Sequence, residues 1–218
     1  MAHKYKSPEE FEFLQDMWQK GKIKRRPSGK GIDWSGENLQ EIRLEDALLD
    51  NAIFITADLS RAMLGNADLS EADLTDTILD SANFEDANLK RAILNDASVN
   101  STKFDGANLS NAYLIGIHTN YPSFVNAIMK KSDLTDARLE GAYFYGADLR
   151  GAILTNGYFF GCVFNEADLR EADLTGADFT AAVFCNAKLD GAIFKDTLIH
   201  KEDAELLTEE QLNGVIFV

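Results

Sequence analysis

A large aliphatic or aromatic residue recurs at every fifth position from Leu39 to Ile199, with Thr119 as the exception and without any insertion or deletion. Alanine occupies 23 of the 33 positions that lie two residues before one of these centres. A period of five matches neither the 3.6-residue turn of an α-helix nor the two-residue alternation of a strand, so the chain must turn at regular intervals. The pattern predicts a solenoid in which the centre and the residue two before it face inward, while the remaining positions face water.

Phenylalanine sets a second period of twenty residues. Six phenylalanines share one phase: Phe84, Phe104, Phe124, Phe144, Phe164 and Phe184. By contrast, the column that begins at Leu49 contains no aromatic residue. Aromatic residues at one phase predict a stacked column inside the solenoid, so four pentads make one coil. About eight coils, at roughly 4.8 Å per hydrogen-bonded rung, predict a rod about 40 Å long.

Four pentads repeat almost letter for letter. They are Asn66-Ala-Asp-Leu-Ser70, Glu71-Ala-Asp-Leu-Thr75, Gly146-Ala-Asp-Leu-Arg150 and Glu166-Ala-Asp-Leu-Arg170. In one unbroken frame these pentads resemble the pentapeptide-repeat family, and the resemblance covers residues 36–200. It implies a mainly β fold, a right-handed quadrilateral parallel β-helix with four faces per coil. It does not imply an activity.

Residues 1–35 are expected to form an N-terminal helix and a basic linker. Ser7-Pro-Glu-Glu10 has the serine, proline and glutamate of a helix start with a capping box, which predicts a helix from about Pro8 to Lys20. The helix carries one apolar stripe: Phe11, Leu14, Met17 and Trp18. Because the apolar end of a solenoid must be covered, we expect this stripe to dock on the first coil, with a free partner-binding helix as the alternative. Six bases between Lys20 and Lys30 indicate a solvated linker.

Residues 201–218 are expected to form a C-terminal helical cap and an apolar tail. A short helical turn is predicted over residues 202–207, and Thr208-Glu-Glu-Gln211 is a second capping box that leads to Gly214. The tail, Val215 to Val218, is predicted to cover the open end of the solenoid. A dimer interface is the alternative, because gyrase-directed members of the family that the chain resembles associate through their C-terminal ends.

The frame is irregular between Ile115 and Phe124. Ile117 and Pro122 occupy positions where alanine is expected, and Thr119 occupies a centre. Proline removes a backbone donor, which predicts a distorted corner or a short bulge, with a binding loop as the alternative.

Charge divides the chain unevenly. The net charge is −15, and residues 1–30 carry eight bases against four acids, so the remainder carries −19. Such a body repels nucleic acid, which favours a basic partner or mimicry of an acidic polymer. No apolar run reaches the roughly 18 residues of a membrane span, and no secretory signal is recognised, so a cytoplasmic location is expected. Cys162 is predicted to point inward and Cys185 outward, as free thiols.

The sequence contains no arrangement that indicates catalysis or metal binding. His3, His118 and His200 lie far apart, and no nucleophile or phosphate-binding motif is present. The many aspartates occupy a repeat position of the pentapeptide family rather than a pair. We therefore expect no enzyme activity, no cofactor and no metal.

The outward positions differ between faces. One face is predicted to be acidic, with candidate residues Asp73, Asp76, Asp96, Asp133, Asp136 and Asp173. Ordinary solubility is the favoured explanation of such a face, because net negative charge keeps rods apart. A candidate protein interface is aromatic and aliphatic: Tyr143, Tyr145, Tyr158, Phe160, Val163 and Val183. Exposed aromatic side chains on a rigid rod are typical of interfaces, although β-propensity alone also favours Tyr and Val on strand surfaces.

Together these features predict a non-enzymatic scaffold that binds an unidentified protein partner, with homodimerisation as an open question and no direct binding of nucleic acid or membrane. The alternative is a DNA-mimicking modulator of a topoisomerase, of the gyrase-protecting or gyrase-inhibiting type that the chain resembles in fold. That function requires an acidic face and a symmetric dimer.

Overall fold

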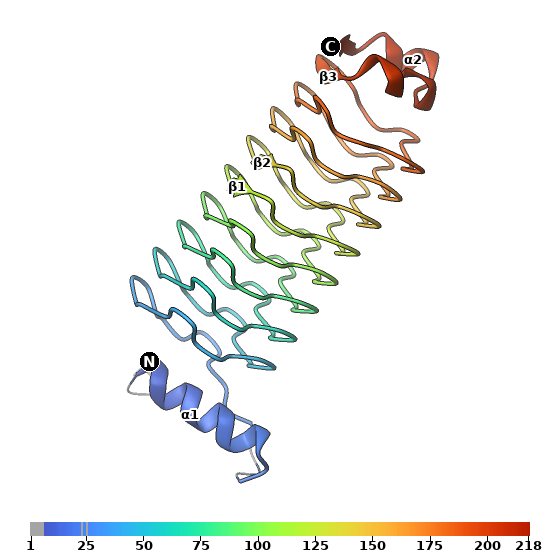
Figure 1. Ribbon diagram of the computed structural model, residues 1–218. Coiled ribbons are helices and arrows are strands. Elements are labelled where there is room, and N and C mark those ends of the chain that lie inside the picture. Colours follow the sequence, from blue (N-terminus) through green and yellow to red (C-terminus); the bar gives the residue numbers. More distant parts are fainter. Residues whose placement is uncertain (1–6, 23, 25) are drawn as a thin grey trace.

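The computed structural model describes residues 7–22, 24 and 26–218. The described chain is a stack of coils with α1 (Pro8–Gln19) at one end and η1 (Lys201–Leu206) and α2 (Glu209–Leu212) at the other (Figure 1). Four short strands are present: β1 (His118–Asn120), β2 (Arg138–Glu140), β3 (Thr197–Ile199) and β4 (Val215–Phe217). The first six residues, where a secretory signal was not recognised, and Arg25 of the basic run lie outside the described residues.

Parallel bridges join residues that are twenty apart along the stack, from Ser28 with Leu48 to Asp178 with Leu198. Each pentad contributes one bridge, so every twenty residues make four faces, as the two sequence periods predict. The ladder begins at Ser28, inside the segment that the sequence analysis assigns to a linker. Gly29 N donates to Leu48 O at 2.8 Å, so Gly29 occupies a centre position. Because glycine has no side chain, the pattern of hydrophobic centres in the sequence does not include this first repeat.

The backbone of one pentad, Ala52 to Thr56, shows why the period is five. Ile53 N donates to Ile32 O of the preceding coil at 2.7 Å, and Phe54 N donates to Asp73 O of the following coil at 2.7 Å. Ala52 N instead closes a turn by donating to Leu49 O at 3.0 Å. Thr56 has a φ of 59°, in the left-handed region, and makes the corner. Three residues therefore build the face and two build the corner.

The aspartate of the Ala-Asp-Leu-Ser/Thr pentad stabilises this corner. Asp58 Oδ1 accepts hydrogen bonds from Ser60 N at 3.0 Å and from Ser60 Oγ at 2.6 Å. Such a bond to the backbone two residues later is an Asx turn, which satisfies an N–H that the ladder leaves free. The repeat aspartate is thus partly a structural residue and not only a solubilising one.

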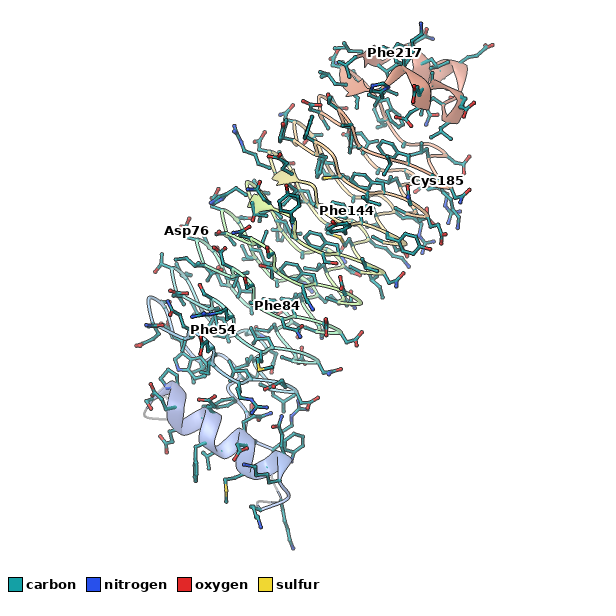
Figure 2. The ribbon with its side chains drawn as sticks, viewed as in Figure 1. Phe54, Asp76, Phe84, Phe144, Cys185 and Phe217 are labelled. Carbon is teal, nitrogen blue, oxygen red and sulfur yellow. The ribbon has the colours of Figure 1, made fainter. Side chains whose placement is uncertain are left out.

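The interior consists of alanines and large centres, as predicted. The aromatic column is stacked, with ring centroids 5.0 Å apart between Phe104 and Phe124 and 4.7 Å apart between Phe144 and Phe164 (Figure 2). Cys162 is buried and Cys185 is exposed, and both are free thiols, which confirms that prediction. Cys162 Sγ donates to Leu139 O at 2.8 Å, and burial raises the pKa of this thiol to about 12.

The irregular segment keeps its register, so the predicted bulge is wrong. β1 pairs with β2 at the usual twenty-residue spacing, with Thr119 opposite Leu139. Pro122 is buried in an alanine position, where the N–H of other pentads closes only a turn and not a rung. Proline therefore removes no ladder bond here. The distortion is local: Pro122 has no N–H to close the turn, His118 N lies 3.3 Å from Ala97 O, and Thr119 is only half-buried where other centres are buried.

At the N-terminal end, α1 lies against the first coil (Figure 1). Ser7 Oγ accepts a hydrogen bond from Glu10 N at 3.3 Å and begins the helix. Phe11 of the predicted stripe is fully buried, and its ring centroid lies 5.6 Å from that of Trp34. Gln15, which the apolar pattern missed, is also buried, and its Nε2 donates to Glu45 O at 2.9 Å. The docked helix thus combines apolar and hydrogen-bonded contacts.

At the C-terminal end, the capping box of α2 is formed between Thr208 and Gln211. The tail covers only part of the end of the stack. β4 pairs in parallel with β3 and adds one rung to one face, and Val215 packs against the core. Ile216 and Phe217 remain 50% and 43% exposed (Figure 2).

Candidate interaction surfaces

The residues predicted as a protein interface occupy two neighbouring faces of the same coils. Tyr143, Val163 and Val183 bridge one another in successive coils and so form one column. Tyr158 and Phe160 lie on the preceding face, on either side of the buried Phe159, and their rings are stacked with centroids 6.1 Å apart. We call the six predicted residues, with Tyr121, the aromatic surface.

Glycine residues form the corner between the two halves of the aromatic surface. Gly141 and Gly161 occupy the corner between the two faces, at φ values of 62° and 66°. No atom lies within 4 Å of where a Cβ of Gly161 would be. A Cβ on Gly141 would lie 2.6 Å from Cε1 of Tyr121, so this ring lies over the glycine. Neither glycine therefore contributes a side chain of its own between the exposed side chains of the two faces.

Tyr121 is the member that the sequence did not reveal. It is 58% exposed, yet it sits in the irregular segment beside Pro122. Its position over Gly141 depends on a residue twenty places later, so only the coil period could have connected the two. Searching for an outward aromatic residue followed at twenty residues by glycine would have found it.

Tyr145 extends the aromatic surface onto the next corner. Its hydroxyl is hydrogen bonded to Glu166 of the following coil, and this bond raises the pKa of the phenol. Its ring is 41% exposed. The polar end of the tyrosine is thus partnered, whereas its ring presents apolar area to solvent.

The aromatic surface rests on the most densely aromatic part of the interior. Phe144 stacks on Phe164, and Phe159 meets both of these rings edge-on at centroid distances of 6.3 and 6.0 Å. Interlocked rings of this kind leave little freedom for the backbone above them. The exposed side chains are therefore presented by a stiff support.

The predicted acidic face is not an uninterrupted acidic surface. Asp73, Asp133 and Asp173 lie in one ladder column, but isoleucines and Tyr113 lie between them. Each carboxylate accepts from the backbone N–H and hydroxyl of the threonine two residues later, for example Asp133 Oδ1 from Thr135 N at 3.0 Å. The other three acids make corners in the left-handed region: Asp76, Asp96 and Asp136. In Figure 2, Asp76 lies on the side of the stack opposite Cys185.

The preceding face, which contains the centres Leu149 and Leu169, carries a ladder of ion pairs. Arg150 and Arg170 each bind the aspartate two residues earlier through two nitrogens, with Arg170 Nε and a terminal nitrogen 2.8 and 2.7 Å from the Asp168 oxygens. The hydrogen bond from Arg170 lowers the pKa of Asp168. Together with Lys130 and Lys131, these arginines surround a shallow hollow of about 310 Å³ above Gly151. Ion pairs within the protein neutralise most of the positive charge around this hollow.

Within the described ranges, no group of three or more histidines, cysteines or acids could hold a metal ion. No helix in this part of the chain has both the length and the apolar character that a membrane crossing requires.

The model of the family described as pentapeptide repeats matches the sequence over residues 38–76, 82–118, 123–156 and 158–198, in eight copies. The chain belongs to the pentapeptide-repeat family. Family neighbours of known structure imply a right-handed β-helix, in agreement with the ladder of bridges described above. No curated protein matches the sequence.

Two solved structures illustrate the similarity. HetL, a protein involved in heterocyst differentiation regulation from the cyanobacterium Nostoc sp. strain PCC 7120, is 28% identical, with 77% of this chain and 83% of HetL covered at a TM-score of 0.42. A trypsin-treated variant of QnrB1, a plasmid-mediated fluoroquinolone resistance protein, is 19% identical, with 85% of this chain and 86% of QnrB1 covered at a TM-score of 0.52. The likeness to QnrB1 supports the fold alone.

Proposed function

We propose that this pentapeptide-repeat protein is a non-enzymatic binding module whose aromatic surface contacts a protein partner. The observation that carries the proposal is the presence of exposed aromatic and aliphatic side chains on two neighbouring faces that meet at the glycine corners Gly141 and Gly161. Aromatic residues are enriched at interface hot spots because they bury large area at little entropic cost. The stacked phenylalanines beneath hold that surface in one geometry, so binding does not have to order it.

The charge of the solenoid supports a partner with a basic surface. The body carries a large negative charge, and long-range attraction would steer a basic protein toward the rod. Contact with the aromatic surface would then provide the short-range part of the affinity. We expect binding to slow at high ionic strength while the apolar contact persists.

Gly161→Asp tests the proposal with little risk to the fold. A Cβ at this position would meet no atom within 4 Å apart from those of its chain neighbours, and aspartate adopts the same left-handed corner conformation in other pentads, such as Asp136. The substitution places a carboxylate in the middle of the aromatic surface. Gly36→Asp is the matched control, because Gly36 is a corner glycine with its nearest neighbour, Thr56 Oγ1, at 3.8 Å.

The measurement is capture of proteins from an extract of the native host, quantified by mass spectrometry, with purified wild type and variants. We expect Gly161→Asp and a Tyr145→Glu, Phe160→Glu double variant to lower recovery of the main partner by about tenfold or more, since about 1.4 kcal/mol of contact energy suffices. Gly36→Asp should retain it. Equal recovery by all four proteins would refute a role for the aromatic surface.

Mimicry of duplex DNA by a topoisomerase modulator is less well supported. Duplex DNA presents regularly spaced negative charge along both strands. Isoleucines and Tyr113 interrupt the ladder carboxylates of the acidic face, and these carboxylates are engaged in turns.

A further inference from the structure

Tyr121 occupies a corner that rarely carries a bulky residue. Its φ is 59°, in the left-handed region, where a large side chain is unfavourable. Among the described corners with a positive φ, it is the one aromatic residue, and most of the others are aspartate, asparagine, glutamate or glycine. The side chain is 58% exposed. A bulky residue at a strained corner, with its ring open to solvent, points to a role outside the stability of the fold.

The following coil provides a glycine beneath this ring. A Cβ on Gly141 would lie 2.6 and 2.7 Å from Cε1 and Cδ1 of Tyr121, so any other residue at this corner would displace the ring. One edge of the ring therefore rests over the glycine backbone, while more than half of the side chain remains open to solvent. The ring is thus held in place on one side and available for contact on the other.

An exposed carboxylate follows the same corner. Tyr121 N donates to Glu140 O at 2.8 Å, and Asn120 lies opposite Glu140 where β1 pairs with β2 (Figure 1). The Glu140 side chain is exposed, and no ion pair within the described chain includes it. Arg138, at the other end of β2, is also exposed and also takes part in none of these ion pairs. Glu140 therefore offers a carboxylate beside an exposed ring, unlike the repeat aspartates that are engaged in turns.

We propose that Tyr121 and Glu140 form a cation site that receives an arginine side chain of the protein partner; this inference rests on the function proposed for the aromatic surface. The guanidinium stacks on the exposed ring and donates to the Glu140 carboxylate, a combination that its planar shape and several N–H groups favour over the ammonium of lysine. An aromatic side chain in this place would leave Glu140 without a partner. The net charge of −19 on the residues after Lys30 attracts such a cation. Arg138 repels it from the far end of β2, which restricts the site to the Tyr121 side of Glu140.

The experiment titrates the full chain with a blocked Gly-Arg-Gly tripeptide at constant ionic strength, and NMR follows the Tyr121 ring and the Gly141 amide. We expect both signals to shift saturably, with a dissociation constant on the order of 10–100 mM for two exposed contacts of this kind. The same peptide with citrulline, which keeps the shape of arginine without its charge, should bind about threefold more weakly or worse. Tyr113 is the internal control, because it is 48% exposed but lines a hollow with Lys90 and Arg91 and should not respond.

Glu140→Gln and Glu37→Gln form a matched pair, since both remove one exposed charge from the rod but only Glu140 lies beside Tyr121. The first should weaken binding of the arginine peptide by about threefold or more, and the second should leave it unchanged. Tyr121→Asn should abolish the response of the Gly141 amide without disturbing the fold, because asparagine makes the same corner at Asn126. Equal binding of the arginine and citrulline peptides, or an equal response at Tyr113, would overturn the proposal.

Recovery of the partner from the host extract separates this inference from the function on which it rests. We expect Tyr121→Asn and Glu140→Gln each to lower recovery by about threefold or more. Recovery lost in Gly161→Asp but kept in these two variants would overturn the cation site and leave the proposed function standing. Recovery kept in all variants, although the arginine peptide still binds at Tyr121, would overturn the proposed function and with it the role of the site.

Discussion

The two ends of the rod are closed to different degrees. At the N-terminal end, Leu49 Cδ2 of the next coil and Phe11 Cε2 of the helix lie 2.8 and 3.2 Å from where a Cβ of Gly29 would be, so both side chains fill the space beside this centre. Glu12 Oε1 accepts from Arg43 N at 2.9 Å, and Gln15 and Gln19 both donate to Glu45 O at 2.9 Å. The helix thereby gives the first coil both an apolar contact and hydrogen-bond partners.

At the C-terminal end, closure is partial. β4 extends one face, Gln211 satisfies two carbonyls, and the N–H groups of Gly191 and Phe194 have no backbone partner within the described residues. The comparison shows that apolar cover and hydrogen-bond closure are separate requirements for the end of a solenoid. A helix that contributes amide and carboxylate side chains can meet both, whereas a short tail meets them on one face only.

Phe11→Ala is expected to have the largest effect on this comparison. Phe11 is fully buried between α1 and the first coil, so its truncation should lower the free energy of unfolding by about 3–5 kcal/mol, through lost burial and a cavity over Gly29. Phe13→Ala is the control on the same helix. Phe13 is 60% exposed, so its change should stay within about 0.5 kcal/mol. Chemical denaturation of both variants is the measurement, and equal losses would show that α1 does not close the first coil.

Gln211→Ala should have a smaller and local effect. Loss of the amide leaves the carbonyl of Ala192 without its replacement for a further rung, at a cost of about 1 kcal/mol. Hydrogen exchange should accelerate in the last coil, while amides near Phe11 remain protected as in the wild type. Acceleration spread evenly over the whole rod would mean that the C-terminal end does not open independently.

Much of the fold could be predicted because the sequence period and the spatial period coincide. The five-residue frame placed Cys162 inside and Cys185 outside, and the twenty-residue period placed the phenylalanines in one stack. The first rung at Gly29 was missed because glycine carries no hydrophobic signal. The assignment of residues 1–35 to helix and linker was also wrong for Trp34, a buried centre whose N donates to Ile53 O. Hydrophobicity also could not show that the repeat aspartates form Asx turns, which requires knowledge of the backbone between two faces.

The candidate sites and the C-terminal end were less predictable, because they depend on positions without a side chain and on backbone donors without a backbone partner. The six residues of the predicted interface occupy two neighbouring faces, and the corner between these faces comes from Gly161 and Gly141, which carry no side chain. Likewise, the free donors of the last coil depend on where α2 lies relative to the edge. No periodic pattern specifies that position, because residues 201–218 lie outside the repeat.

Low pH should slightly lower the stability of the coils beside the C-terminal end. This is the smallest of the expected effects. The backbone of Asp168 forms a parallel β-bridge with Lys188 of the last coil. The hydrogen bond from Arg170 lowers the pKa of the Asp168 carboxyl. A carboxyl whose pKa is lower in the folded state stabilises the protein above its unfolded pKa of about 3.9, and that contribution is lost as the pH falls through the folded pKa. Arg170→Gln should therefore lower Tm by a few degrees at most at pH 7, and by less near pH 2.

Lys30→Gln provides the comparison at the closed end. Lys30 pairs with Asp50 through a single nitrogen and is 67% exposed, whereas Arg170 binds Asp168 through two nitrogens. A single exposed ion pair contributes little, so Lys30→Gln should shift Tm less than Arg170→Gln at pH 7. Thermal unfolding of both variants at pH 7 and near pH 2 separates the two pairs. If the Arg170→Gln difference were as large near pH 2 as at pH 7, the arginine would act through packing of its stem rather than through the charge of Asp168.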